Sequence, residues 1–405
     1  MEINLGDCSF ILICSALVLL MTPGLAFFYG GMVRRKNVLN TLMSSFFVCG
    51  LASIMWVLVG YSLSFGNDFH GIIGGLNFLG FNGVGTEPSA YAPTIPQELF
   101  AAFQMMFAII TPALITGALV ERMKFSALFI FVAIWSLLVY YPMAHMVWGA
   151  GGLISSLGAV DFAGGNVVHI SSGISGLVAC IMLGKRRGHG IMAYRPHNIP
   201  FVVLGVALLW FGWFGFNAGS ALGAGPLAVH AFMTTNTAAA AAMLSWMLIE
   251  KVKHGKPTLL GAATGAVLGF VPLWSSIIIG IAVSPICFFF VEKVKAKFGY
   301  DDALDAFGCH GIGGIWGGIA TGIFGQTAIN PVAQWNGLFY GDVKLFIAQI
   351  MSIVITIIFA GGMTFLIIKV MKMFMDIRVD SSEEADGLDV AEHGESAYPS
   401  FNGLD

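Results

Sequence analysis

The chain has 405 residues, of which 57% are hydrophobic and 10% are charged, and its formal net charge at pH 7 is -3. A soluble domain carries about a quarter charged residues, so this composition excludes a soluble globular protein. The slightly acidic balance also offers no basic surface to a nucleic acid, and we expect the lipid bilayer to surround most of the chain.

Apolar runs with few or no charges recur along the chain, for example at Ile11–Phe28, Leu42–Leu63 and Leu345–Ile368. A helix needs about 20 such residues to span a bilayer. Met1–Asp7 is short and acidic and lacks the basic start of a secretory signal, so we expect the first run to be retained as a spanning helix. The expected helices cover residues 8–31, 41–65, 98–120, 125–144, 165–184, 199–218, 229–250, 258–272, 275–294, 304–325 and 343–372.

The positions of Lys and Arg predict the topology. All of the 19 Lys and Arg except Lys344 fall in six clusters. Because cytoplasmic loops are rich in Lys and Arg, we expect all six clusters inside, which places the N-terminus outside and the C-terminus inside. The chain is then an all-α polytopic membrane protein with about eleven transmembrane helices. The clusters are Arg34–Lys36, Arg122–Lys124, Lys185–Arg195, Lys251–Lys256, Lys293–Lys297 and Lys369–Arg378.

Two segments differ in composition from the helices. Residues 66–97 contain Gly, Pro and Asn and are expected to form a long external loop. Residues 380–405 contain many Asp and Glu but no Lys or Arg. We therefore predict a transmembrane domain of residues 1–378 and a cytoplasmic tail of residues 379–405.

The odd helix count suggests two inverted five-helix repeats followed by a final helix. A second unit of five helices would enter the membrane from the opposite face, and transporters built in this way bind their substrate between the halves. A short echo supports the repeat, since Asp161 precedes His169 and Asp305 precedes His310 at Gly-containing helix starts. Chance similarity between Gly-rich helices explains this echo equally well.

Of nine histidines, only His169 and His310 lie clearly within expected helices, whereas His145 and His230 fall in or near external loops. Ionisable residues inside a bilayer are costly and usually face an interior pathway. The alternative is a packing histidine that is bonded to a backbone carbonyl. A metal site needs three or four ligands, and no third intramembrane ligand is apparent. We therefore expect no metal and no cofactor.

Asp161 lies just before Gly164 and Gly165 at an expected external helix start. A carboxylate at this position accepts hydrogen bonds from the first amides of the helix. We interpret it mainly as a structural cap, with an anion near a cation entry site as the alternative.

Aromatic residues cluster at the expected external ends of several helices. Phe103 and Phe107 are four residues apart and share one helix face. Trp213 and Phe216 are flanked by glycines, and Trp148 follows another apolar run. Aromatic residues at membrane interfaces are commonly belt residues that contact lipid headgroups, but the glycines beside Trp213 and Phe216 favour tight packing.

Long motifs in this sequence resemble those of the ammonium transporter (Amt/Mep/Rh) family, and in particular its bacterial and archaeal Amt branch. The resemblance covers nearly the whole chain. It is carried by PGLAFFYGG at 23–31, VRRKN at 33–37, GALVERM at 117–123, DFAGGNVVH at 161–169, GWFGFNAGS at 212–220, FGCHG at 307–311, EADGLD at 384–389 and HGESAY at 393–398.

The resemblance implies a role for each matching residue. An external ammonium recruitment site would be formed by Phe103, Phe107, Trp148 and Ser220. The pore below would be closed by the stacked rings of Phe107 and Phe216 and lined by His169, His310 and Trp213. Asp161 would support the recruitment site without touching the ion.

The resemblance also implies how the protein works in the cell. The substrate would be ammonium or ammonia, with methylammonium as an analogue. The protein would be a homotrimer in the cell membrane with a pore through each subunit, and a cytoplasmic P-II signalling protein would dock on it. The tail would then be a regulatory element.

Four other functions remain as alternatives. The first two are an ammonium sensor that transports little and an Rh-like gas channel. An intramembrane enzyme would need a nucleophile or a metal near the histidines, and since none is visible we expect no enzyme and no catalytic residue. A sodium-coupled carrier would need carboxylates or unwound backbone at the membrane midplane, and the sequence gives only Gly-rich hints of this.

Overall fold

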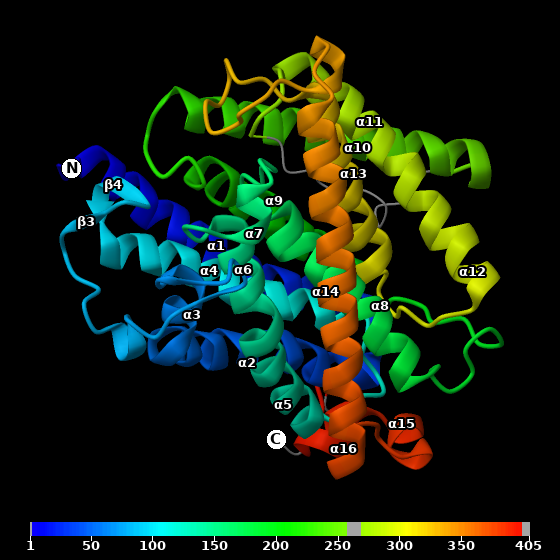
Figure 1. Cartoon of the computed structure of the whole chain (residues 1–405). Coiled ribbons are helices and arrows are strands. Elements are labelled where there is room, and N and C mark those ends of the chain that lie inside the picture. The colour runs from blue at the N-terminus through cyan, green and yellow to red at the C-terminus, as the bar shows by residue number, and fades with distance from the viewer. Residues whose placement is uncertain (1, 257–268, 399–405) are drawn as a thin grey trace.

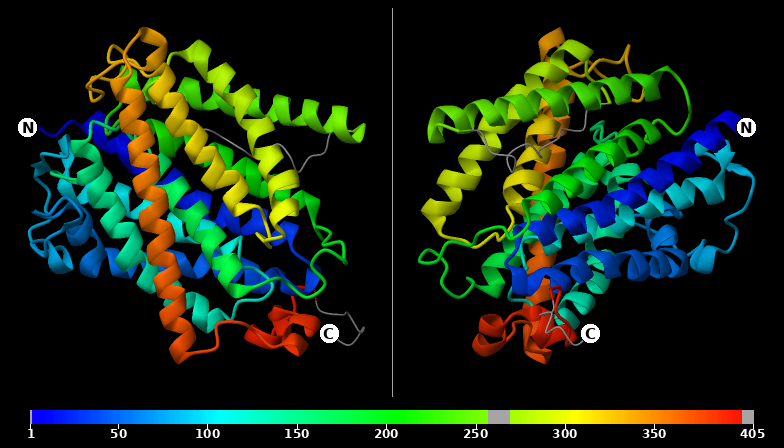
Figure 2. Two further views of the ribbon diagram at one scale, coloured as in Figure 1. Left: turned by 45° about the vertical axis from the view of Figure 1, so that its right-hand side comes forward. Right: turned by 180° about the vertical axis from the view of Figure 1, so that it is seen from behind.

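The computed structural model describes residues 2–256 and 269–398, and nearly all of its regular structure is helical (Figure 1). Long apolar helices pack side by side, and the N- and C-terminal ends lie far apart on the molecule in every view (Figure 2). Among the described residues, nine helices are long and apolar enough to cross a membrane. The expected polytopic architecture is confirmed in this respect.

The first half of the chain runs from α1 to α8. Its helices are α1 (Leu5–Met32), η1 (Arg35–Asn37), α2 (Val38–Met55), η2 (Trp56–Gly60), α3 (Tyr61–Phe65), η3 (Leu79–Phe81), α4 (Gln97–Thr116), α5 (Phe125–Trp135), η4 (Ser136–Tyr140), α6 (Tyr141–Trp148), α7 (Leu153–Ser156), η5 (Gly165–Ile170) and α8 (Ser171–Leu183).

The second half begins with α9 and ends in the tail. Its helices are α9 (Ile199–Gly219), α10 (Pro226–His254), α11 (Leu273–Phe289), η7 (Phe290–Val294), α12 (Lys295–Phe298), η8 (Phe307–Gly311), α13 (Ile312–Phe324), η9 (Leu338–Tyr340), α14 (Lys344–Phe374), α15 (Ser381–Asp386) and α16 (Leu388–His393).

Two of the eleven expected spans are not among the nine. The expected helix at 258–272 lies mostly outside the described residues, and its last four residues are not helical. The expected helix at 304–325 is present as η8 and α13, but its many glycines leave it less apolar than the others. The number eleven therefore stays a prediction.

The expected external loop at 66–97 contains regular structure that the sequence did not reveal. Strand β1 (Asp68–Phe69) pairs antiparallel with β2 (Ile73–Gly74), and β3 (Pro88–Ser89) pairs with β4 (Ala92–Pro96). Such short strands carry too few residues to show an alternating pattern. His145 on α6 holds the first hairpin in place, because its Nε2 lies 2.9 Å from Asp68 Oδ1.

Glycines allow the central helices to approach each other closely. A Cβ atom on Gly205 of α9 would lie 2.3 Å from the backbone nitrogen of Phe28 on α1. A Cβ atom on Gly173 of α8 would lie only 2.2 Å from the backbone nitrogen of Gly311 in η8. Any side chain at Gly173 would separate α8, which follows His169, from η8, which contains His310.

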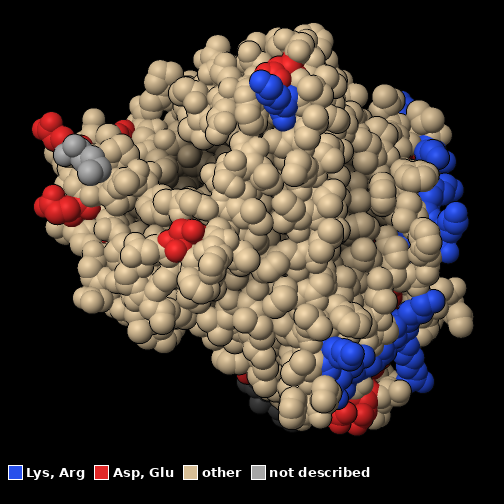
Figure 3. Space-filling model, in the orientation of Figure 1, with Lys and Arg blue, Asp and Glu red and all other residues tan. Residues whose placement is uncertain are grey.

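Charged residues are absent from most of the face shown in Figure 3. Lys and Arg gather at its right and lower right, on the side where α8, α12 and the tail lie in Figure 1. The uncharged middle of this face suits contact with lipid, and the basic side corresponds to the predicted cytoplasmic side.

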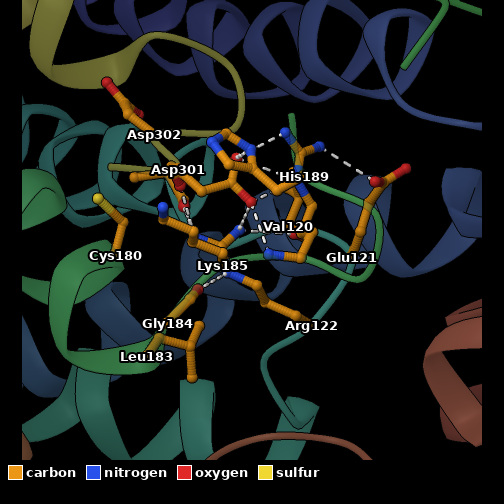
Figure 4. Close-up of polar contacts among 12 residues, drawn as sticks. Val120, Glu121, Arg122, Cys180, Leu183, Gly184, Lys185, His189, Asp301 and Asp302 are labelled. Carbon is orange, nitrogen blue, oxygen red and sulfur yellow. Dashed lines mark hydrogen bonds and ion pairs between the residues drawn. The ribbon is translucent and has the colours of Figure 1, made fainter. Parts of the chain in front are cut away.

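Buried ion pairs join the loops on this basic side (Figure 4). Arg186 forms two parallel hydrogen bonds with Asp301, at 2.9 and 2.8 Å, and also lies 3.1 Å from Glu121. Arg122 donates to the carbonyl oxygens of Gly184 and Asp301, at 2.9 and 2.6 Å. Burial alone would raise the pKa of the Asp301 carboxyl, but hydrogen bonds from Arg186 and the charges of Arg122 and Arg186 hold that pKa well below its ordinary value.

The tail folds back against the same loops. Backbone amides of Asn40 and Arg187 donate to Asp389 and Glu384 of the tail, at 2.9 and 2.5 Å. The backbone amide of Leu388 donates to the side chain of Asn37 at 2.9 Å. The described part of the tail therefore contacts both the α1–α2 and the α8–α9 connections.

Candidate functional site

A vestibule of about 370 Å³ lies at the ends of α4, α6 and α9, on the side that the topology prediction places outside. It is lined by Phe107, Trp148 and Ser220, three of the residues expected to recruit the substrate. The Ser220 hydroxyl donates its hydrogen to the carbonyl oxygen of Phe216, at 2.8 Å. Because the hydrogen is used in this way, the lone pairs of the hydroxyl are available to a donor in the vestibule.

Phe103, the fourth expected recruitment residue, lies behind this surface. Its ring is 0% exposed and packs edge-on against Phe107, with the ring centroids 5.0 Å apart. It is not among the residues that line the vestibule. The structure therefore places Phe103 where it supports the Phe107 ring.

Asp161 orients Trp148 and caps the helix that carries His169. Its carboxylate accepts hydrogen bonds from the backbone amides of residues 164–167, at 2.6 to 3.2 Å. Its carbonyl oxygen accepts the indole N–H of Trp148 at 2.9 Å. These contacts agree with the interpretation of Asp161 as a cap.

Two phenyl rings separate the vestibule from the interior. The centroids of Phe107 and Phe216 are 4.4 Å apart, and each ring is 1% exposed. The two rings come from α4 and α9, which are far apart in sequence. Their contact leaves no room between them for a hydrated ion in this conformation.

His169 and His310 lie together on the inner side of the phenyl rings. Their ring planes are within 12° of parallel, and their centroids are 5.5 Å apart. Phe216 and Trp213 lie 6.1 and 6.5 Å from the His169 ring. The Nε2 atom of His169 is buried and has no hydrogen-bond partner among the described residues.

Both histidines lie in single π-helical turns, η5 and η8, at the start of their helices. Such turns are rare and are frequent at functional sites. In the second half, Asp302 is the capping carboxylate, since it accepts from the amides of Ala306 and Phe307 at 3.0 and 2.8 Å. The expected counterpart, Asp305, instead pairs with Lys295 at 2.7 Å. Both histidine helices therefore begin at a capping aspartate, Asp161 in the first half and Asp302 in the second. The sequence analysis had instead paired Asp161 with Asp305.

Cavities adjoin the histidine pair on two sides. One of about 250 Å³ is lined by both histidines together with Trp213, Phe216 and residues of α1. A smaller one of about 50 Å³ is lined by both histidines, Asp161 and glycines of α13. The vestibule, the phenyl pair and the histidine cavity thus follow one another through the molecule.

One expectation about a histidine was wrong. His145 was placed just beyond the expected helix at 125–144, but it lies within α6. His230 lies near the start of α10, at the border where it was expected. The His145 ring is fully buried and reaches the carbonyl oxygen of Ser64 as well as Asp68. The helix that includes α6 extends four residues beyond its expected end, which brings His145 inside it.

Gln104 is a vestibule residue that the sequence reasoning missed. It is the only polar side chain between Phe103 and Phe107 on an apolar spanning helix. A polar residue one turn from an expected binding aromatic is a signal that could have identified it.

Comparisons with known proteins agree with this arrangement. The family model described as Ammonium Transporter Family matches residues 9–398. A protein of Bacillus subtilis named "Ammonium transporter" is 53% identical over 98% of this chain and 99% of its own length. A "Putative ammonium transporter" of Methanothermobacter thermautotrophicus is 47% identical over 98% of this chain and 99% of its own length. The crystal structure of Saccharomyces cerevisiae Mep2 matches with a TM-score of 0.86 and 34% identity, covering 94% of this chain and 88% of that one.

Proposed function

This chain belongs to the ammonium transporter family, whose model spans nearly all of it, and we propose that it binds ammonium in the external vestibule and passes it inward as ammonia. The observation that carries this proposal is the order of parts along the passage. A vestibule with aromatic walls is followed by a closed phenyl pair and then by two buried histidines.

The vestibule attracts a small cation by two means. The faces of Phe107 and Trp148 attract a cation by about 0.5–2 kcal/mol. Ser220 accepts a hydrogen bond, because its own hydrogen is bound to Phe216. The indole N–H of Trp148 donates to the carbonyl oxygen of Asp161, so this N–H group is not directed toward the cation. Ammonium carries four N–H donors and suits these acceptors.

The phenyl pair and the histidines favour the neutral form of the substrate. Moving a charge to the centre of a bilayer costs several kcal/mol even on lenient scales. Ammonium avoids this cost if it loses a proton and crosses as neutral ammonia. Potassium has the same charge but no proton to lose. Each neutral imidazole offers one N–H donor and one acceptor nitrogen, so the unpartnered Nε2 of His169 is suited to bind ammonia or to receive a proton.

Uptake into proteoliposomes tests this function. Purified protein should take up methylammonium at a rate that saturates with concentration, and excess potassium should not compete. Empty liposomes are the control. Saturable uptake that potassium blocks would contradict the deprotonation step. A transport current measured on the same vesicles separates the alternatives, because a gas channel moves no charge.

The protein's surroundings are also inferred. We place it in the cell membrane with the N-terminus outside and the tail in the cytoplasm, because its Lys and Arg gather on the tail side and cytoplasmic loops are rich in them. A homotrimer and a docked P-II signalling protein are proposed from family membership. The relatives are named transporters, so an ammonium sensor with little transport is the less favoured function.

A further inference from the structure

Gln104 lies on the vestibule wall one helical turn from two aromatic residues. It follows Phe100 by four residues on α4 and precedes Phe107 by three, and positions with these spacings share one helix face. All three side chains line the vestibule. Trp148 and Ser220 line it as well, so Gln104 borders the space in which the cation is proposed to bind.

The carboxamide oxygen of Gln104 has no hydrogen-bond partner. Oε1 is buried, and no donor among the described residues reaches it. A buried polar atom without a partner costs about 1–3 kcal/mol. Gln97, on the same helix, shows the usual arrangement, because its amide donates to the hydroxyl of Tyr61 at 3.1 Å.

An ammonium ion in the vestibule needs more acceptors than the expected residues provide. It carries four N–H groups, but only the Ser220 hydroxyl presents a free lone pair among the expected residues. The aromatic rings attract the charge without satisfying hydrogen bonds as an oxygen does. The last torsion of Gln has a broad preference, so the oxygen can turn from its buried position toward a bound cation.

We propose that the Gln104 carboxamide oxygen accepts a hydrogen bond from ammonium in the external vestibule, which makes Gln104 a residue that selects for N–H donors. This inference rests on the proposed recruitment of ammonium at Trp148 and Ser220. The aromatic faces attract any small cation, whereas the two oxygen acceptors favour cations with N–H groups.

Cations with and without N–H groups separate this role from simple packing. In proteoliposomes, Gln104→Leu should raise the half-saturation concentration of methylammonium about tenfold, as expected for a hydrogen bond to a charged donor. Tetramethylammonium, which has no N–H group, serves as a competitor. The concentration at which it inhibits methylammonium uptake should be the same in Gln104→Leu as in the wild-type protein. Gln104→Met is the second variant, because its unbranched side chain keeps the shape of Gln. Gln104→Asn should recover part of the affinity.

Gln97→Leu is the matched control, since Gln97 lies on the same helix as Gln104 but is not among the residues that line the vestibule. It should leave both cations unaffected. Unchanged methylammonium affinity in both Gln104→Leu and Gln104→Met would overturn the inference. An equal loss of affinity for methylammonium and for tetramethylammonium would overturn it as well. Ser220→Ala tests the proposed function separately. If Ser220→Ala weakens methylammonium uptake and the Gln104 variants do not, only the role of Gln104 fails.

Discussion

The residues at the centre of the passage are few and chemically simple. The two imidazoles lie beside the Trp213 indole and the Phe216 ring, and cavities adjoin the histidines on two sides. Imidazole suits this place because it offers both a donor and an acceptor without needing a charge. In the proposed function, the vestibule would provide oxygen acceptors for the charged substrate, and the interior would provide nitrogen atoms for the neutral one.

Replacing either His169 or His310 with Ala should reduce the discrimination between ammonium and potassium more than it reduces stability. The reason is that each change opens the passage to water, and water lowers the cost of moving a charged ion. Competition by potassium in the uptake assay measures discrimination, and the thermal unfolding midpoint in detergent measures stability. Full selectivity in the double Ala variant would contradict a role for the pair.

At the scale of elements, the starts of the two histidine helices are the parts most strongly constrained. Each begins with a π-helical turn, and each is capped by an aspartate. The near contact of Gly173 with Gly311 fixes how closely the two helices cross. The tail reaches the opposite end of the same framework, since Glu384 accepts from the Arg187 amide next to the Arg186–Asp301 pair.

Deleting the residues after Arg378 should change the rate of methylammonium uptake or abolish binding of a P-II protein. The deletion removes the contacts of Glu384 and Asp389 with the α8–α9 connection and the start of α2. The measurements are the uptake rate and co-purification with a P-II protein. Glu395→Gln, a change in the same acidic tail away from these two carboxylates, serves as the control. If the truncated protein matches the full chain in both measurements, the tail is not regulatory.

For the whole molecule, the distribution of charge determines how the chain sits in a membrane. The face in Figure 3 is uncharged across most of its middle, and most of its basic residues lie on the side of the tail. Buried ion pairs of Arg186 with Glu121 and Asp301 tie described loops on that side together.

The inferred orientation predicts which loops react with a membrane-impermeant thiol reagent on intact cells. A single cysteine placed in the loop at 66–97 should be labelled from outside. One placed between Lys185 and Arg195 should be labelled only after the cells are opened. A variant without the six native cysteines provides the background. The reverse pattern would overturn the topology.

The sequence by itself determined the class of protein and the position of most helices. Hydropathy and the clustering of Lys and Arg depend only on local composition, because a bilayer accepts long apolar helices and retains positive loops inside. Their positions within expected spanning helices singled out His169 and His310, whereas the roles of Phe107, Phe216 and Trp148 were implied by the family resemblance.

Only the tertiary structure decided which of these residues meet and which do not. The contact of the two histidines depends on the crossing of α8 and η8, and residues this far apart in sequence carry no local signal of it. The identity of the second cap also carries no local signal: Asp302 accepts from the Phe307 amide, while Asp305 pairs with Lys295. Phe103 shares a helix face with Phe107 but is covered by neighbouring packing, and Gln104 faces the vestibule instead. Helix periodicity predicts which face a residue occupies, whereas the neighbouring helices decide what that face contacts.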